Sequence, residues 1–129
     1  MSGVEWFGAV EEKAVADATA ELPGVLTEDM LEQVVERIVR ALAPERVILF
    51  GSYAEGRASD DSDLDLLVVT ARTLSHQERF EHLRGLFLDI PLPVQVITIS
   101  RQEFEETRGV IGGIAHPATL YGKVVYEKP

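Results

Sequence analysis

Residues 49–69 read LFGSYAEGRASDDSDLDLLVV, and they join two apolar runs through a polar loop. The runs, Arg46–Phe50 and Leu64–Val69, have the length and composition of buried β-strands. Asp63 and Asp65 stand at alternate positions where the second run begins, so their side chains share one face, about 6–7 Å apart along the backbone. Two unpaired carboxylates there repel each other and are costly to bury without a cation. Mg²⁺ suits such a site, because it binds one or two carboxylates together with waters and substrate phosphates.

The loop between the two runs carries groups that bind phosphate. Gly51-Ser52 directly follows the first run, and Ser52 can begin a short helix that Gly56 ends. Glycine allows close approach of the backbone, while a hydroxyl and the free amides of a helix start donate hydrogen bonds to phosphate oxygens. Arg57 can either reach a phosphate or remain in solvent. Together with the aspartates, the loop predicts a nucleoside-triphosphate site.

This combination resembles the signature of the DNA-polymerase-β-like nucleotidyltransferase superfamily, and specifically of its minimal nucleotidyltransferases. The matching residues are Gly51, Ser52, Ala54, Gly56, Ser62, Asp63 and Asp65. The resemblance extends from about Leu26 to the C-terminus. It implies an α/β (α+β) nucleotidyltransferase fold in residues 26–129, with a small mixed β-sheet covered by helices. Residues 1–25 are then an N-terminal helical extension.

The resemblance also implies a division of roles within the site. In such enzymes a glycine-serine turn holds the triphosphate of ATP or another nucleotide, and two aspartates bind two Mg²⁺ ions. Nucleotide binding is accordingly assigned to Gly51, Ser52, Gly56 and Arg57. Metal binding and catalysis are assigned to Asp63 and Asp65. A third carboxylate, on a neighbouring strand, shares one ion and helps to deprotonate the acceptor hydroxyl.

The third carboxylate position departs from this pattern. Where the family typically has valine-aspartate-valine, this chain has Val94-Gln95-Val96. An amide accepts no proton at neutral pH, and its oxygen is a neutral ligand, so the change could reduce the rate by about 10²–10⁴-fold. Asp60, Asp61 and Asp89 are acids that could compensate, although none has the right strand phase. Gln95 could also be a buried, hydrogen-bonded amide without a role in the site.

Two functions remain open at this stage. Minimal nucleotidyltransferases are often encoded beside a small helical protein of the HEPN family and resemble antitoxins, of which some adenylylate the toxin and others act by binding. The first function is therefore transfer of AMP to a hydroxyl of such a partner. The alternative is a catalytically inactive module that neutralises a partner by complex formation. Either a homo-oligomer or a hetero-oligomer is compatible with the sequence.

Composition limits the other possibilities. The 129 residues suit one domain, and the absence of cysteine excludes disulfides and thiolate chemistry and is compatible with a reducing cytoplasm, the expected location. The net charge of −10 leaves few cations for phosphate contacts, so nucleic acid is not expected as the main partner. No apolar run approaches the length of a membrane span, and the acidic N-terminus does not resemble a signal peptide.

The remaining elements follow from periodicity and capping residues. Glu5–Leu22 has an apolar stripe at helical spacing and ends at Pro23-Gly24, which predicts a helix packed on the body or offered to another chain. Thr27 begins a second helix, which ends before Pro44. A strand over Val94–Ile99 and a closing strand over Lys123–Tyr126 complete the predicted sheet.

Two further helices are expected in the second half of the chain. Ser75 opens one that runs to about Leu88, with a buried side. The residues of that side are Phe80, Leu83, Phe87 and Leu88. A short helix follows Ser100. Glycines loosen the segment that begins at residue 109, and His116 is expected to be a loop residue there.

Overall fold

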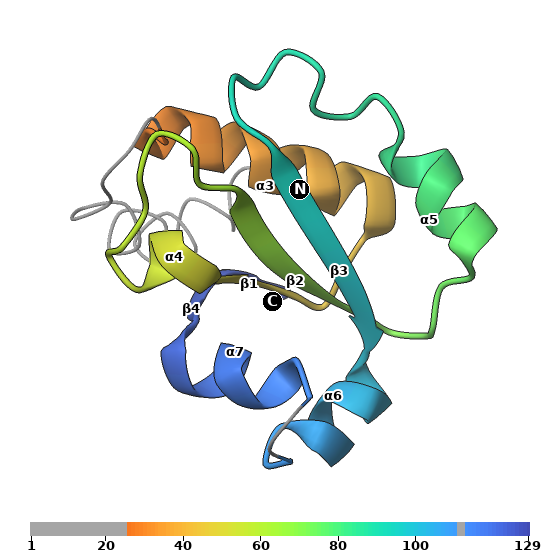
Figure 1. Cartoon of the computed structure of the whole chain (residues 1–129). Helices are drawn as coiled ribbons and strands as arrows, with labels where there is room; N and C mark the ends of the chain where they lie inside the picture. Colours follow the sequence, from red (N-terminus) through yellow and green to blue (C-terminus); the bar gives the residue numbers. More distant parts are fainter. Residues whose placement is uncertain (1–25, 111–112) are drawn as a thin grey trace.

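The computed structural model describes residues 26–110 and 113–129, so the helix predicted over Glu5–Leu22 lies outside the described residues. The described elements are, in chain order, α3 (Glu28–Leu42), β1 (Arg46–Phe50), α4 (Gly51–Ala54), β2 (Leu64–Thr70), α5 (His76–Leu83), β3 (Val94–Ser100), α6 (Arg101–Thr107), α7 (Ala115–Tyr121) and β4 (Lys123–Glu127). Figure 1 shows them arranged around one twisted sheet. None of the described helices is long and apolar enough to cross a membrane.

The sheet has four strands in the order β3-β2-β1-β4. β1 is antiparallel to both β2 and β4, whereas β2 and β3 are parallel. Parallel strands need a crossover, and the chain from α5 to the start of β3 provides it. The expectation of a small mixed sheet covered by helices is confirmed.

Helix α3 forms as its sequence predicts. The hydroxyl of Thr27 accepts a hydrogen bond from the amide of Met30, and acidic residues occupy the first turn. The helix ends at Ala43, which has a φ of +46° and donates its amide to the carbonyl of Val39. Its buried side consists of Leu31, Val34, Val35 and Ile38.

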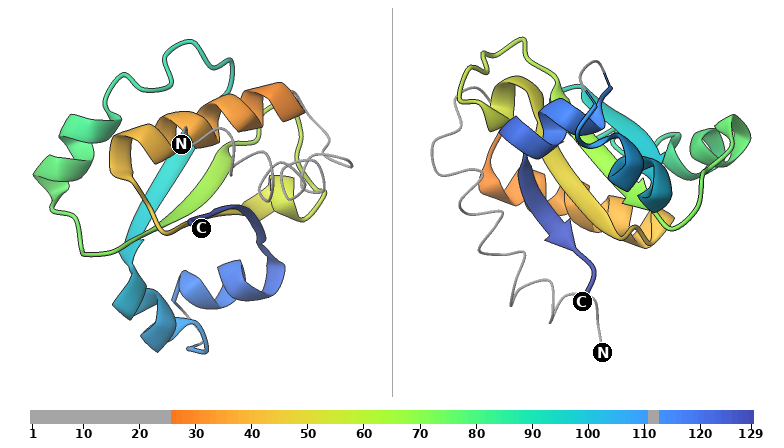
Figure 2. Two further views of the ribbon diagram at one scale, coloured as in Figure 1. Left: turned by 180° about the vertical axis from the view of Figure 1, so that it is seen from behind. Right: turned by 90° about the horizontal axis from the view of Figure 1, so that it is seen from below.

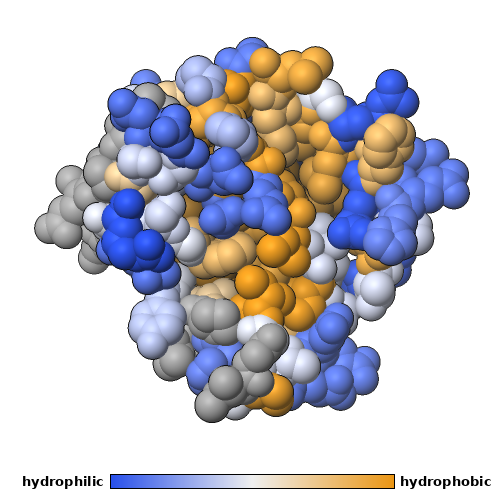
Figure 3. All heavy atoms as spheres, in the orientation of Figure 1, coloured by the Kyte–Doolittle hydropathy of each residue, from blue (hydrophilic) through white to orange (hydrophobic). Residues whose placement is uncertain are grey.

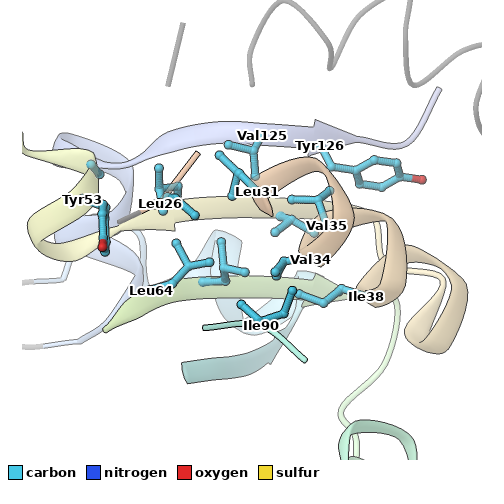
Figure 4. Packing of buried hydrophobic residues seen from close by; sticks show 14 of the residues in the cluster. Leu26, Leu31, Val34, Val35, Ile38, Tyr53, Leu64, Ile90, Val125 and Tyr126 are labelled. Carbon is cyan, nitrogen blue, oxygen red and sulfur yellow. The ribbon is translucent and has the colours of Figure 1, made fainter. Parts of the chain in front are cut away.

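Helices cover both faces of the sheet, as the view from below in Figure 2 shows. On one face α3 packs on alternate strand residues, among them Leu49, Leu64 and Leu66 (Figure 4). On the other face, α6 and α7 pack on a second cluster that includes Leu67 and Ile99. Because strand side chains alternate, Asp65 and Gln95 belong to the α6–α7 face.

The prediction for α5 is wrong at its C-terminal end. The helix stops at Leu83 because Arg84 takes an extended conformation and Gly85 has a φ of +70°, so the chain turns away before Leu88. α5 has no buried residue. Phe80 is 63% exposed and Leu88 is 89% exposed, whereas Leu83 and Phe87 are half-buried.

The segment around His116 is helical, so the expectation that His116 is a loop residue is wrong. Helix α7 spans Ala115–Tyr121, and Pro117 is tolerated because it lies in the first turn. Ala115 and Ala118 bury their small side chains against the sheet. A Cβ on Gly122 would lie 2.4 Å from the carbonyl oxygen of Ala118, so the chain requires glycine to pass from α7 into β4.

Candidate functional site

The two aspartates and Gln95 come together on the α6–α7 face. Asp65 is the second residue of β2 and pairs in register with Gln95 on the parallel strand β3. Paired residues of neighbouring strands point to the same face, so the carboxylate and the amide are neighbours. Asp63 lies two residues before Asp65, just ahead of the strand, and is exposed. Figure 3, in the orientation of Figure 1, shows hydrophilic atoms and apolar atoms lying side by side near the centre of the surface.

Gln95 is exposed, so its side chain faces solvent rather than the core. The alternative of a buried amide is wrong. The amide occupies the place beside Asp65 where the resemblance requires a third carboxylate, and it is the only polar side chain of β3 before Thr98.

The glycine-serine turn lies directly against Asp65. Phe50 at the end of β1 pairs with Asp65, and Gly51 begins α4 immediately afterwards. Gly51 has a φ of +75°, and a Cβ built on it would lie 2.4 Å from Oδ2 of Asp65. Only glycine fits this contact without a shift, because it has no Cβ and adopts positive φ freely. The turn and the carboxylate therefore form one compact unit.

The start of α4 has no side-chain cap. Phe50 is the N-cap residue of α4 and makes no side-chain capping hydrogen bond. The backbone of the turn is closed by bonds from the amide of Glu55 to the carbonyl of Gly51 and from the amide of Arg57 to that of Ser52. These bonds use carbonyls of the turn, whereas the first amides of a helix have no partner within it.

The loop that leads to Asp63 is ordered by Ser62. The hydroxyl of Ser62 accepts a hydrogen bond from the amide of Ser59 at 2.9 Å, and the amide of Ser62 donates one to the carbonyl of Ser59 at 3.1 Å. The amide of Leu64 then donates to the carbonyl of Pro93 at 2.8 Å, which joins the start of β2 to the start of β3. The motif position of Ser62 was evident in the sequence, but this loop-closing contact was not, since it depends on the folded turn.

Burial raises the pKa of the Asp65 carboxyl, and the nearby negative charge of Asp63 raises it further. Both causes disfavour the ionised form in the same direction. A cation between the two groups would remove this penalty. Carboxylate oxygens are the ligands that Mg²⁺ prefers, so the donor set fits a divalent ion, and the amide oxygen of Gln95 could add one neutral ligand.

The other acids do not complete the set. The carboxylate of Asp89 accepts two hydrogen bonds from the guanidinium of Arg37, at 2.6 and 2.8 Å, which lowers the pKa of Asp89. Asp60 and Asp61 are exposed in the loop. Over residues 26–110 and 113–129, no group of three histidine or acidic side chains is placed to hold a metal ion.

Arg57 is exposed and pairs with Glu55 rather than with an aspartate of the site. Its guanidinium is exposed and lies 3.4 Å from the carboxylate of Glu55. Exposed pairs of this kind are weak, so the arginine can change partner at little cost.

A mixed sheet that places a glycine-serine turn beside two alternate aspartates defines a nucleotidyltransferase-type domain. The family model described as "Nucleotidyltransferase domain" matches residues 31–113, and the chain belongs to this family. No curated protein sequence matches the chain.

Two solved structures are similar in fold. A toxin–antitoxin crystal structure with AMP-PNP has a TM-score of 0.56 at 23% identity, over 75% of this chain and 73% of that one. A mutant of the toxin–antitoxin MntA-HpeT has a TM-score of 0.54 at 21% identity, over 81% of this chain and 75% of that one. At these identities the similarity is one of fold.

Proposed function

We propose that this domain binds a nucleoside triphosphate with Mg²⁺ and acts as the antitoxin-like member of a pair with a helical HEPN-type protein. The observation that carries the proposal is the contact between Gly51 and Asp65, which joins a phosphate-binding turn to a carboxylate that lacks a counter-ion among the described residues. The fold neighbours support it, since one toxin–antitoxin structure was solved with AMP-PNP.

Each group in the site has a defined part in this proposal. The backbone and hydroxyl of the Gly51-Ser52 turn hold phosphate oxygens, with Gly56 ending the turn and Arg57 adding a positive charge at its rim. Asp63 and Asp65 hold Mg²⁺, which would neutralise the charge of the triphosphate when bound. The assays below use ATP as the nucleoside triphosphate.

Transfer of AMP, the finer part of the proposal, would form a bond from the acceptor oxygen to the α-phosphorus and break the bond to the bridging oxygen. Pyrophosphate leaves, and the hydroxyl proton must pass to a base. Gln95 cannot take that proton, and it contributes no charge. We therefore expect nucleotide binding with transfer that is weak in the natural sequence.

Calorimetry of ATP with Mg²⁺ tests the binding step. Wild type should bind, and the double variant Asp63→Asn/Asp65→Asn should lose most of the Mg²⁺-dependent affinity. Leu88→Asn, an exposed change outside the site, is the control. Equal binding by wild type and the double variant would refute the metal role of the two aspartates.

The second candidate function is a module that neutralises its partner by binding alone, and Gln95 is the observation that favours it. Gln95→Asp restores a carboxylate beside Asp65 and should raise Mg²⁺-dependent transfer to a partner hydroxyl by about 10²-fold or more. Incorporation of labelled AMP into the co-purified helical partner measures this. If Gln95→Asp still gives no transfer while the complex forms, the binding module is the better description. If wild type already matches the variant, Gln95 does not limit transfer.

A further inference from the structure

Tyr53 connects the glycine-serine turn to the core of the protein. It is the third residue of α4, directly after Ser52, and its side chain is fully buried. It is also the largest of the fully buried side chains among the described residues. The ring belongs to the core cluster on the α3 side of the sheet, at the end of that cluster where Figure 4 shows Leu26 and Leu64.

Tertiary packing must determine where α4 lies, because this helix has little stability of its own. It comprises four residues, and its N-cap residue Phe50 makes no side-chain capping hydrogen bond. A single helical turn is unstable in water unless other parts of the protein pack against it. The buried residues of α4 are Tyr53 and Ala54, and the aromatic ring has by far the larger apolar surface of the two.

The same core cluster also holds the start of the strand that carries the aspartates. Leu64 stands between Asp63 and Asp65 in the sequence, and its fully buried side chain belongs to the α3-side cluster together with Tyr53. Close-packed cores transmit small displacements from one side chain to the next. The packing around Tyr53 and Leu64 therefore bears on the turn and on the two carboxylates at once.

The ring of Tyr53, and not its hydroxyl, makes this connection. The hydroxyl has no hydrogen-bond partner among the described residues. A phenylalanine would keep the ring and its packing, whereas a leucine would leave part of the volume unfilled. The two substitutions thus separate the ring from the polar group.

We propose that Tyr53 is a positioning residue of the nucleotide site, whose ring packs with Leu64 and so fixes the Gly51-Ser52 turn relative to the two aspartates. The effect of Tyr53 on ATP binding rests on the proposed function, whereas its effect on the turn does not. The close approach of Gly51 to Asp65 restrains the same turn from the α6–α7 side. The turn is thus held by one contact on each side of the sheet.

Hydrogen exchange of the backbone amides, measured without nucleotide, tests the position of the turn. Tyr53→Leu should speed exchange several-fold in residues 49–56, and the conservative variant Tyr53→Phe should restore the wild-type rates. Ile38→Ala is the matched control, because Ile38 is equally buried in the same cluster but lies at its other end (Figure 4). It lowers the global stability, but amides that exchange through local opening of the turn should not respond to it.

Calorimetry of ATP with Mg²⁺ tests the consequence for binding. Tyr53→Leu should weaken binding by about 10-fold or more, because a small misplacement of positioning groups has effects of this size. Tyr53→Phe and Ile38→Ala should bind as wild type does. Denaturant unfolding of each variant defines the temperature at which all of them are folded. Leu64→Val, a smaller change on the other side of the contact, should also speed exchange in the turn, and it serves as the test if Tyr53→Leu does not fold.

Two outcomes would overturn the proposal. The first is wild-type exchange in the turn of folded Tyr53→Leu or, if that variant does not fold, of Leu64→Val. The second is an Ile38→Ala variant that speeds exchange in the turn or weakens ATP binding as much as Tyr53→Leu, because loss of stability alone would then be the cause. Failure of wild type to bind ATP would instead refute the proposed function, and the exchange measurement would still decide the role of Tyr53.

Discussion

Replacement of Gly51 by alanine tests the contact on which the site is built. Gly51 and Gly56 have nearly equal positive φ values, +75° and +72°. A Cβ on Gly51 would lie 2.4 Å from Oδ2 of Asp65, whereas a Cβ on Gly56 would meet nothing within 4 Å. Gly56→Ala is therefore a matched control that contains the backbone strain without the collision.

The two changes should differ by the cost of the collision. An alanine at positive φ costs about 1–2 kcal/mol in either variant. In Gly51→Ala the carboxylate of Asp65 or the strand that carries it must also move, and overpacking of this kind costs about 1–3 kcal/mol more. Gly51→Ala should thus lose about 2–5 kcal/mol of unfolding free energy, as estimated from these two contributions.

Denaturant unfolding of both variants measures the difference, and calorimetry with Mg²⁺ and ATP measures the site. The double variant Gly51→Ala/Asp65→Ala removes the carboxylate with which the new methyl group would collide. It should therefore recover part of the stability that Gly51→Ala loses. Equal losses in Gly51→Ala and Gly56→Ala, or no coupling between positions 51 and 65, would show that the close approach has no energetic weight.

Three other changes probe separate parts of the fold. Tyr53→Phe should be neutral or stabilise by up to about 1 kcal/mol, because the buried hydroxyl of Tyr53 has no hydrogen-bond partner among the described residues; a clear loss in denaturant unfolding would reveal one. Asp65→Asn should raise the melting temperature in Mg²⁺-free buffer at neutral pH, with a gain that shrinks as pH falls. The pKa of Asp65 is raised in the fold, so wild-type stability decreases as pH rises through that pKa. At pH values above the ordinary pKa of Asp89, Arg37→Ala should lower the melting temperature slightly. This difference should shrink as pH falls through the lowered pKa of the folded state, leaving only the effect of the hydrogen bond from Arg37 to the carbonyl of Leu86; an unchanged difference in acid would contradict the pairing.

The sequence predicts those parts of the fold that local signals determine. Thr27 and the stripe that follows it define α3 because capping and periodicity act within a few residues. The end of α5 was missed because Gly85 turns the chain, although the periodicity continues to Leu88. Helix α7 was missed for a related reason: Ile114 at its start gives no side-chain cap, and packing of Ala115 and Ala118 on the sheet stabilises it instead.

As with the fold, only part of the candidate site could be predicted from the sequence. The shared face of Asp63 and Asp65 follows from strand alternation, which is a local property. The pairing of Asp65 with Gln95 joins strands from different parts of the chain, and only the resemblance to a family could anticipate it. The contact between Gly51 and Asp65 was not predicted at all, because it depends on the exact approach of a turn to a strand.

Under the proposed function, these contacts would bear differently on nucleotide binding and on transfer. Burial of Asp65, together with the negative charge of Asp63, raises the free energy of the ionised form of the Asp65 carboxyl. A bound cation offsets this cost, so the arrangement is understandable as a metal-binding device. Gln95 carries no charge and is exposed, so it adds no comparable cost. In the proposed function, Asp65 and the Gly51 turn would serve binding, while the position beside Asp65 holds an amide that cannot accept the proton that transfer requires.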